Sequence, residues 1–225
     1  MPSITIRIFV SAVFALTSLA ALGQQNTVRV SVEQINVHSD SQNLRSNGPA
    51  FLTPQPAAIA IGDTTILQLV YTRKIDPHWD LDVQAGIPPR LDVKGLGTLA
   101  PFGVIAHIRQ AGPTIFATYH FGAPENRFRP FAGVGLNYSR FYDAQATDSG
   151  RLVAGGPTRI SLSDSFGPAA KIGASYRLVD RWSLVGTIGT ARLKTDVSST
   201  TGSIERTTSV VLRPVGFSIG VAASF

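Results

Sequence analysis

Apolar and polar residues alternate along much of this chain, most clearly at its C-terminus. From position 211 the odd-numbered residues are mostly bulky and apolar up to Phe225, whereas the even-numbered ones are mostly small or polar. The same period of two recurs at 79–87, 113–121 and 166–178, and more weakly at 27–37, 64–73, 130–142 and 182–194. This period is typical of a β-strand with one apolar face. The sequence therefore predicts eight strands, each near the roughly 9–11 residues of a tilted membrane-spanning strand.

The links between the predicted strands alternate in length. Short links occupy 74–78, 122–129 and 179–181, and long polar links occupy 39–62, 92–111, 143–163 and 197–206. Short turns at one rim and long loops at the other are typical of outer-membrane barrels, whose turns face the periplasm. We therefore expect an all-β fold, an eight-stranded antiparallel up-and-down transmembrane β-barrel with both termini on the turn side.

Two details refine this expectation. The strand at 27–37 changes phase between Val32 and Ile35, which predicts a β-bulge. A soluble eight-stranded barrel of the lipocalin type is the alternative, but its apolar faces would then fill a narrow lumen with aromatic rings. Several aromatic residues instead lie near the short-turn ends of strands, where a membrane barrel has its aromatic girdle: Trp79, Tyr119, Phe121, Phe131, Tyr176 and Trp182.

The first 23 residues have the pattern of a cleavable signal peptide. Arg7 is followed by an apolar run over 8–22, and the small residues Ala21 and Gly23 precede Gln24, the expected mature start. The alternative, an uncleaved anchor, is disfavoured because the run is short for a span and no basic cluster follows it. The expected organisation is a signal peptide at 1–23 and one barrel domain at 24–225.

Composition narrows the class further. Charged residues make up 15% of the chain, below the roughly 25% of a typical soluble protein. The chain has no cysteine, which excludes disulfides, thiol chemistry and a lipoprotein anchor. The net charge of +6 is spread along the chain, so we expect no nucleic-acid partner.

Four stretches resemble the OmpW family of outer-membrane proteins. FRPFAGVGLNYSRFYD at 128–143 resembles the family's FRPYxGxGxNYTxFFD. PT at 113–114 with YHF at 119–121 resembles its PPT…QYHF strand, LSDSFG at 162–167 its LxDSWG, and YRLVDRW at 176–182 its DYRLTDRW turn. The chain departs from the family at Phe131, Phe166 and Ser175, where Tyr, Trp and Asp are usual.

The resemblance implies a monomeric eight-stranded barrel in the outer membrane, with a narrow and partly apolar lumen. It implies passage of small, often hydrophobic or amphipathic molecules. The terminal Phe225 resembles the residue by which the outer-membrane assembly machinery selects barrel chains. The expected partners are therefore this machinery, the lipid and lipopolysaccharide of the outer membrane, and small hydrophobic solutes.

Charged residues on the inward faces predict a lumen network, formed by Arg29, Glu33, Asp80, Asp82, Lys171 and Arg177. Eight strands leave an interior that side chains just fill, so these charges must pair or be hydrated. Two interpretations stay open. The network is either a salt-bridged plug that stabilises the barrel, or part of a gated path.

Apolar residues indicate a path for a cargo. Val70, Phe116 and Val185 point inward, and the long links carry apolar residues that we expect at the mouth: Phe51, Leu52, Leu96, Leu99 and Phe102. The resemblance places the constriction at Gln84 and Gly189, where family members carry bulky apolar side chains. In this chain the constriction would be looser or more polar.

No residue pattern indicates catalysis, a cofactor or a metal site. The four histidines, His38, His78, His107 and His120, lie far apart without a second ligand at metal spacing, and we expect His120 to form a structural lumen hydrogen bond. The first hypothesis is a narrow outer-membrane channel. The second is a non-conducting structural or surface-interaction barrel whose loops bind partners, and a lipid-modifying enzyme is a distant third.

Overall fold

The computed structural model describes residues 26–225, so the predicted signal peptide and Gln24 lie outside the described part of the chain. The strands are β1 (Asn26–Ser41), β2 (Arg45–Ser46), β3 (Ala57–Ile61), β4 (Thr64–Lys74), β5 (Trp79–Gly86), β6 (Arg90–Gly97), β7 (Val104–Ala111), β8 (Thr114–His120), β9 (Phe128–Ala146), β10 (Thr158–Leu162), β11 (Ser165–Val179), β12 (Trp182–Ala191), β13 (Leu193–Thr201) and β14 (Ile204–Ser224). The helices are η1 (Ala50–Leu52), η2 (Ala100–Phe102) and α2 (Asp148–Ala154). Within residues 26–225 no helix is long and apolar enough to cross a membrane.

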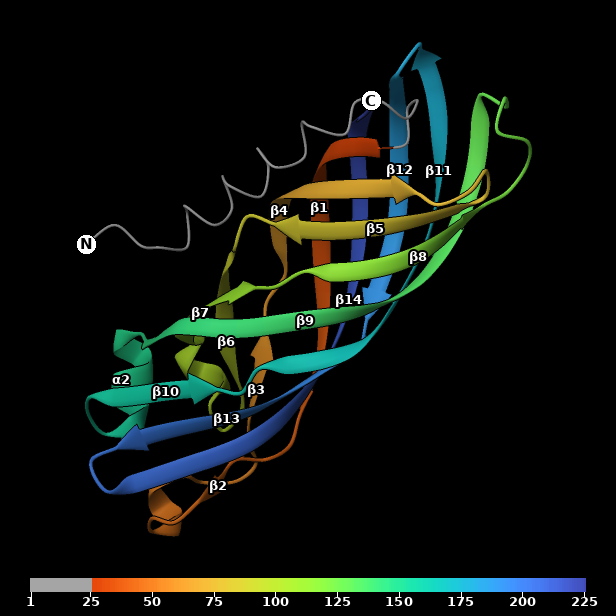
Figure 1. Ribbon diagram of the computed structural model, residues 1–225. Coiled ribbons are helices and arrows are strands. Elements are labelled where there is room, and N and C mark those ends of the chain that lie inside the picture. The colour runs from red at the N-terminus through yellow and green to blue at the C-terminus, as the bar shows by residue number, and fades with distance from the viewer. Residues whose placement is uncertain (1–25) are drawn as a thin grey trace, which may run out of the picture.

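Eight strands close into a ring. The order around it is β1, β4, β5, β8, β9, β11, β12 and β14, with every neighbouring pair antiparallel. The last strand returns to the first, from Thr27 opposite Ser224 to Ser41 opposite Val210. Closure leaves no unpaired edge. The predicted up-and-down barrel is confirmed, and both described ends of the chain lie at the rim with the short turns (Figure 1).

The wall continues beyond this ring at the end away from the termini. Here β3, β6, β7, β10 and β13 lie end to end with the ring strands β4, β5, β8, β11 and β12, while β1, β9 and β14 run through both parts. We call this second part the extension. Figure 1 shows it with α2, β10 and the β13–β14 hairpin at its far end. The prediction of long loops is largely wrong, because most of those residues are strand. We call each continuous strand of the wall a stave, whether it is one element or two elements that lie end to end. The fourteen strand elements then form eight staves and the short β2.

The polarity of the two faces reverses where the ring meets the extension. On β1, Val30 and Val32 are exposed on the outer face. The next outward residue is Gln34, while Ile35 points inward and lines a cavity. The register of β1 against both neighbours is continuous, so the bulge predicted between Val32 and Ile35 is wrong. The change of phase reflects a change of surroundings, from hydrocarbon outside the ring to water outside the extension.

The extension encloses an apolar core of its own. Its buried members come from both the through-running strands and the added ones: Ala57, Ile59, Ile61, Leu91, Val93, Leu99, Ala106, Ile108, Phe141, Leu193, Val210 and Leu212. Because the outer face of the extension is polar, this part has the inside-apolar arrangement of a soluble barrel. The arrangement stabilises strands that the membrane does not surround.

The ring is apolar on its outer face instead. Exposed aliphatic and aromatic residues there form a continuous band, which we call the apolar belt: Val30, Val32, Leu67, Leu69, Leu81, Val83, Ile115, Val134, Leu136, Ile172, Leu184, Ile188, Phe217, Ile219 and Val221. An exposed apolar band made of this many large side chains is unfavourable in water and typical of a surface that faces lipid.

Aromatic residues border the apolar belt at the short-turn end. Trp79 and Trp182 are exposed there, and the ring of Tyr119 lies 5.1 Å from those of both Trp79 and Phe121. Phe131 is different, because it is 5% exposed and its ring lies 5.3 Å from that of His120 inside the barrel. The girdle prediction is therefore wrong for Phe131, whose position on β9 has the inward phase.

The belt makes a testable prediction at Val134, an exposed residue midway between the two rims on β9. Val134→Arg would place a guanidinium in hydrocarbon, which we expect to destabilise the folded barrel by about 2–4 kcal/mol. Urea unfolding in lipid vesicles measures this change. Ser161→Arg, on the outer face of the extension, is the control and should stay within about 0.5 kcal/mol. Equal effects of the two substitutions would contradict the assigned position of the belt.

Candidate functional site

A buried ion pair crosses the lumen of the ring. The Nζ of Lys171 on β11 lies 2.5 Å from the Oδ2 of Asp82 on β5, and the two residues are 5% and 4% exposed. The hydroxyl of Thr118 donates to the same oxygen at 2.6 Å, and that of Thr72 donates to Oδ1. The ammonium also lies 4.5 Å from the ring centroid of Phe116. The carboxylate thus has three polar partners, which together contact both of its oxygens, the arrangement that a buried charge requires.

Two further charged residues lie close to this pair in the same layer of the lumen. The guanidinium of Arg29 is buried and donates to Thr187 Oγ1 at 3.1 Å. The amide of Gln68 donates to a carboxylate oxygen of Glu33 at 2.5 Å. These contacts join β1 to its neighbour β4 and, across β14, to β12.

The remaining predicted charges lie nearer the short-turn rim. Asp80 and His120 form a contact of 2.9 Å between Oδ2 and Nε2. Arg177 is exposed at the rim, where it donates to the carbonyl of Pro124 at 2.7 Å. The sequence-predicted network is therefore divided in the structure. Arg29, Asp82 and Lys171 are buried together, whereas Arg177 stands apart at the rim.

The ion pair lies between two cavities. The middle cavity, of about 160 Å³, is on the extension side, and Glu33, Gln68, Phe116 and Lys171 are among its lining residues. The lower cavity, of about 140 Å³, is on the short-turn side and also includes Lys171, together with Asp82. We call the contacts of Asp82 and Lys171 the plug, because these side chains occupy the lumen between the two spaces.

A third and larger cavity of about 450 Å³ lies inside the extension. Apolar side chains make up most of its wall, and Arg206 is its one charged lining residue within the described chain. Burial lowers the pKa of Arg206, whose Nε donates to Thr53 Oγ1 at 2.9 Å. This upper cavity and the middle one share the side chain of Ile61, so only one layer of side chains separates them.

The apolar residues predicted for the path and mouth are distributed among these spaces. Gln84, Gly189 and Phe116 line the middle cavity, and Val70 and Val185 line the lower one, beyond the plug. Of the predicted mouth residues, Phe51, Leu99 and Phe102 line the upper cavity. Leu96 is 42% exposed outside it, and the side chain of Leu52 lies outside what the structure describes.

The ladder of the wall is interrupted beside the middle cavity. The pairing of β5 with β8 ends at Gln84 opposite Thr114, and the pairing of β6 with β7 begins at Arg90 opposite Arg109. No register pairs join 85–89 to 110–113. Pro88 and Pro89 lie in this interval and have no N–H to donate. We call it the ladder gap, and Ala85, Gly86, Pro89, Ala111 and Gly112 at its edges line the middle cavity.

Sequence reasoning missed the uncharged half of the site. Thr72, Thr118, Gln68 and Thr187 hold the buried charges, yet in the sequence they are only inward polar residues, and all but Thr118 lie on weakly alternating strands. The signal that could have identified them is their phase, since each lies on the inward face of its strand. The upper cavity was missed because its walls lie in segments that were assigned to loops.

The described residues contain no group of three or more His, Cys, Asp and Glu side chains placed to hold a metal ion. The lumen offers apolar surface along its cavities and one buried ion pair.

Removing one partner of the plug gives a second prediction. Lys171→Met would leave the Asp82 carboxylate buried without its counter-ion, and we expect a loss of about 3–5 kcal/mol of stability. Adding Asp82→Asn should recover part of that loss, because no buried charge then remains uncompensated. Urea unfolding of the four proteins of this double-mutant cycle gives the coupling. Arg213→Met, which breaks the exposed Arg213–Asp40 pair, should cost less than about 1 kcal/mol, and an equal cost for Lys171→Met would contradict the assigned role.

Comparison with known proteins agrees with this architecture. The family model described as the OmpW family matches residues 23–225. Outer membrane protein W of Vibrio cholerae serotype O1 is 30% identical over 169 residues, which cover 74% of this chain and 76% of that protein. A dibenzothiophene metabolism operon protein, PahQ of Pseudomonas aeruginosa, is 29% identical over 164 residues, with 72% of each chain covered.

The fold has a solved counterpart. The crystal structure of the outer membrane protein OprG from Pseudomonas aeruginosa matches with a TM-score of 0.79 at 22% identity, covering 89% of this chain and 95% of that one. The apolar belt, the closed ring and the match over nearly the whole chain lead to one assignment. The chain belongs to the OmpW family and is a β-barrel of the outer membrane.

Proposed function

We propose that this protein passes small apolar or amphipathic molecules across the outer leaflet of the outer membrane. The cargo enters the upper cavity, moves past Ile61 into the middle cavity and leaves sideways through the ladder gap. The observation that carries the proposal is the sequence of cavities, which leads from the extension to the ladder gap and meets the plug below it.

The upper cavity supports the apolar part of the proposal. Its volume of about 450 Å³ lies within the roughly 300–1,000 Å³ of typical small-molecule sites, which are also mostly apolar. Arg206 is the one charged side chain among its described lining residues. A molecule with an apolar body and a small polar group fits this chemistry.

The plug supports the sideways exit. Moving a cargo straight down the barrel would separate Lys171 from Asp82 in a space where water cannot replace the lost contacts, which is costly. The ladder gap needs no such separation, because the middle cavity already reaches its edges at Pro89 and Gly112. An apolar molecule that leaves there meets hydrocarbon rather than water, which favours its release.

A relative supports the choice of cargo class. The name of PahQ connects that protein with the metabolism of dibenzothiophene, an aromatic compound with almost no polar surface. For this chain we infer the chemical class only, an apolar small molecule.

Filling the middle cavity tests the path. Gly189 lines it, and a Cβ at this position would meet its nearest atoms at 3.7 and 3.8 Å, so a larger side chain would extend into the space. We expect Gly189→Trp, or Gln84→Trp opposite it, to reduce the rate of dibenzothiophene uptake by intact cells at least tenfold. Gly186→Trp is the matched control, because Gly186 lies on the same strand and is exposed on the outer face.

Uptake that is unchanged by Gly189→Trp would overturn a path through the lumen. If cells with and without the wild-type protein also take up the compound at the same rate, the second hypothesis replaces the first. The protein would then be a non-conducting barrel whose outer end binds partners.

A second test separates the sideways exit from an axial one. Pro88→Val with Pro89→Val restores two backbone donors that could pair with 110–113 and narrow the ladder gap. We expect uptake to fall several-fold while the protein becomes no less stable to urea. Pro168→Val is the control, since Pro168 is an exposed wall residue within an unbroken ladder. Full uptake by the Pro88→Val/Pro89→Val protein would support an axial exit instead.

A further inference from the structure

Three arginines gather on the outer face of the wall, directly beyond the ladder gap. Arg90 on β6 lies opposite Arg109 on β7 in the strand register. Arg140 on β9 is paired with Ala111, two residues along β7 from Arg109. All three side chains are exposed. We call Arg90, Arg109 and Arg140 the arginine cluster.

This placement is unfavourable for the isolated protein. Residues directly opposite on antiparallel strands have Cβ atoms about 4.5–5.5 Å apart, and like charges there destabilise the pair. The carboxylate of Asp143 compensates Arg109 alone, at 3.3 Å. Asp92, the next outward residue on β6, is held by His107 at 2.7 Å. Among the described residues, Arg90 and Arg140 have no ion pair.

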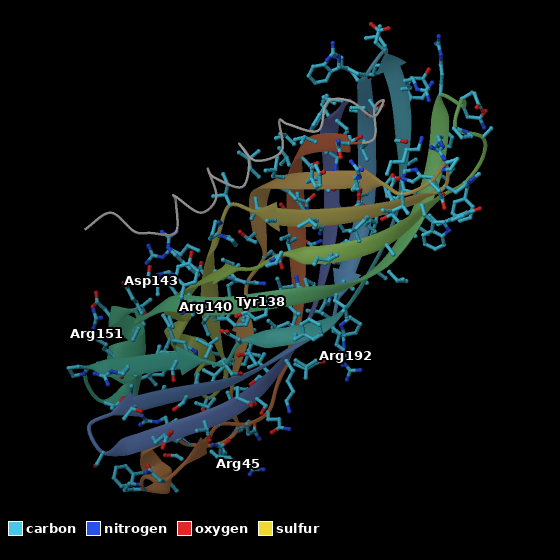
Figure 2. All side chains as sticks on the ribbon, viewed as in Figure 1. Arg45, Tyr138, Arg140, Asp143, Arg151 and Arg192 are labelled. Atoms are coloured by element: carbon cyan, nitrogen blue, oxygen red, sulfur yellow. The ribbon has the colours of Figure 1, made fainter. Side chains whose placement is uncertain are left out.

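The arginine cluster lies at the height of the membrane surface. Arg90 follows the exposed Ile87 by three positions, and Arg140 follows the exposed Leu136 by four. Three or four residues of a tilted strand correspond to roughly 8–10 Å along the barrel axis. Tyr138 and Tyr142, both exposed on β9, flank Arg140 on the same face. Figure 2 shows Tyr138, Arg140 and Asp143 along β9 toward α2.

We infer that the arginine cluster binds a phosphate group of lipopolysaccharide, the glycolipid of the outer leaflet. Arginine forms paired hydrogen bonds with phosphate oxygens in a planar geometry that lysine lacks. The cluster carries three positive charges and one compensating carboxylate, which complements the charge of up to −2 on a phosphate monoester. The acyl chains of the same lipid would then lie against the apolar belt below. This inference does not depend on passage of any cargo.

The test compares two double variants that remove the same charge. Arg90→Gln/Arg140→Gln disrupts the arginine cluster, whereas Arg45→Gln/Arg159→Gln removes two exposed arginines of the extension. Each folded protein, in a neutral detergent, is titrated with lipopolysaccharide that carries its lipid A phosphates and with an enzymatically dephosphorylated form. We expect wild-type protein and the Arg45→Gln/Arg159→Gln control to bind the phosphorylated form at least tenfold more tightly than the dephosphorylated form. The Arg90→Gln/Arg140→Gln protein should lose this preference.

Salt and free phosphate complete the test. The preference should weaken as salt concentration rises, because exposed charges are screened. Inorganic phosphate at millimolar concentration should not displace the lipid, which also contacts the apolar belt; displacement would indicate a site for the free ion and overturn the lipid assignment. Equal binding of both lipid forms by wild-type protein, or equal loss in the two double variants, would overturn the inference. Unchanged mobility of the folded barrel on unheated gels establishes that both variants fold.

Discussion

In the hydrocarbon of a membrane, a backbone N–H or C=O finds no water to replace a missing partner, so the ring must be closed by its own hydrogen bonds. The unbroken pairing of β1 with β14 satisfies this constraint. Closing eight strands makes the lumen narrow enough for side chains to fill it. The charges that face inward must then be held by one another and by neighbouring hydroxyls, as Asp82 is by Lys171 and Thr118. The plug is therefore a consequence of closure in a small ring.

The ladder gap is where the wall departs from that constraint. Pro88 and Pro89 carry no N–H, so this interval of the wall has fewer donors that need a partner. The interruption lies beside the middle cavity and just below the arginine cluster. A proline pair thus allows a break in the wall at a depth where an unpaired ladder of other residues would be unfavourable.

The sequence predicts the ring well and the extension poorly, for one physical reason. Alternation identifies a strand when its two faces meet different surroundings, as at Val30 and Val32, which face lipid. Beyond the ring the surroundings exchange places, so the apolar residues of one stave move to the opposite face. If this exchange is not known, the change of phase between Val32 and Ile35 predicts a bulge. The strands of the extension at Ala57–Ile61 and Thr158–Leu162 then resemble loops. Inward charges such as Asp82 are visible in the sequence, but their partners are set by the register across strands.

The reversal of polarity between the ring and the extension also fixes the depth of the barrel in the membrane. If the barrel moved along its axis by two residues of β1, either Gln34 would enter hydrocarbon or Val32 would enter water. Because the other staves also change polarity where the ring ends, each of them holds the barrel at the same depth in the membrane. From that level β14 continues from Arg213 to Ile204, ten residues that rise roughly 20 Å along a tilted strand. The apolar interior of the extension thereby continues outward beyond the membrane surface. In the proposed path, an apolar molecule meets an apolar surface before it reaches the membrane.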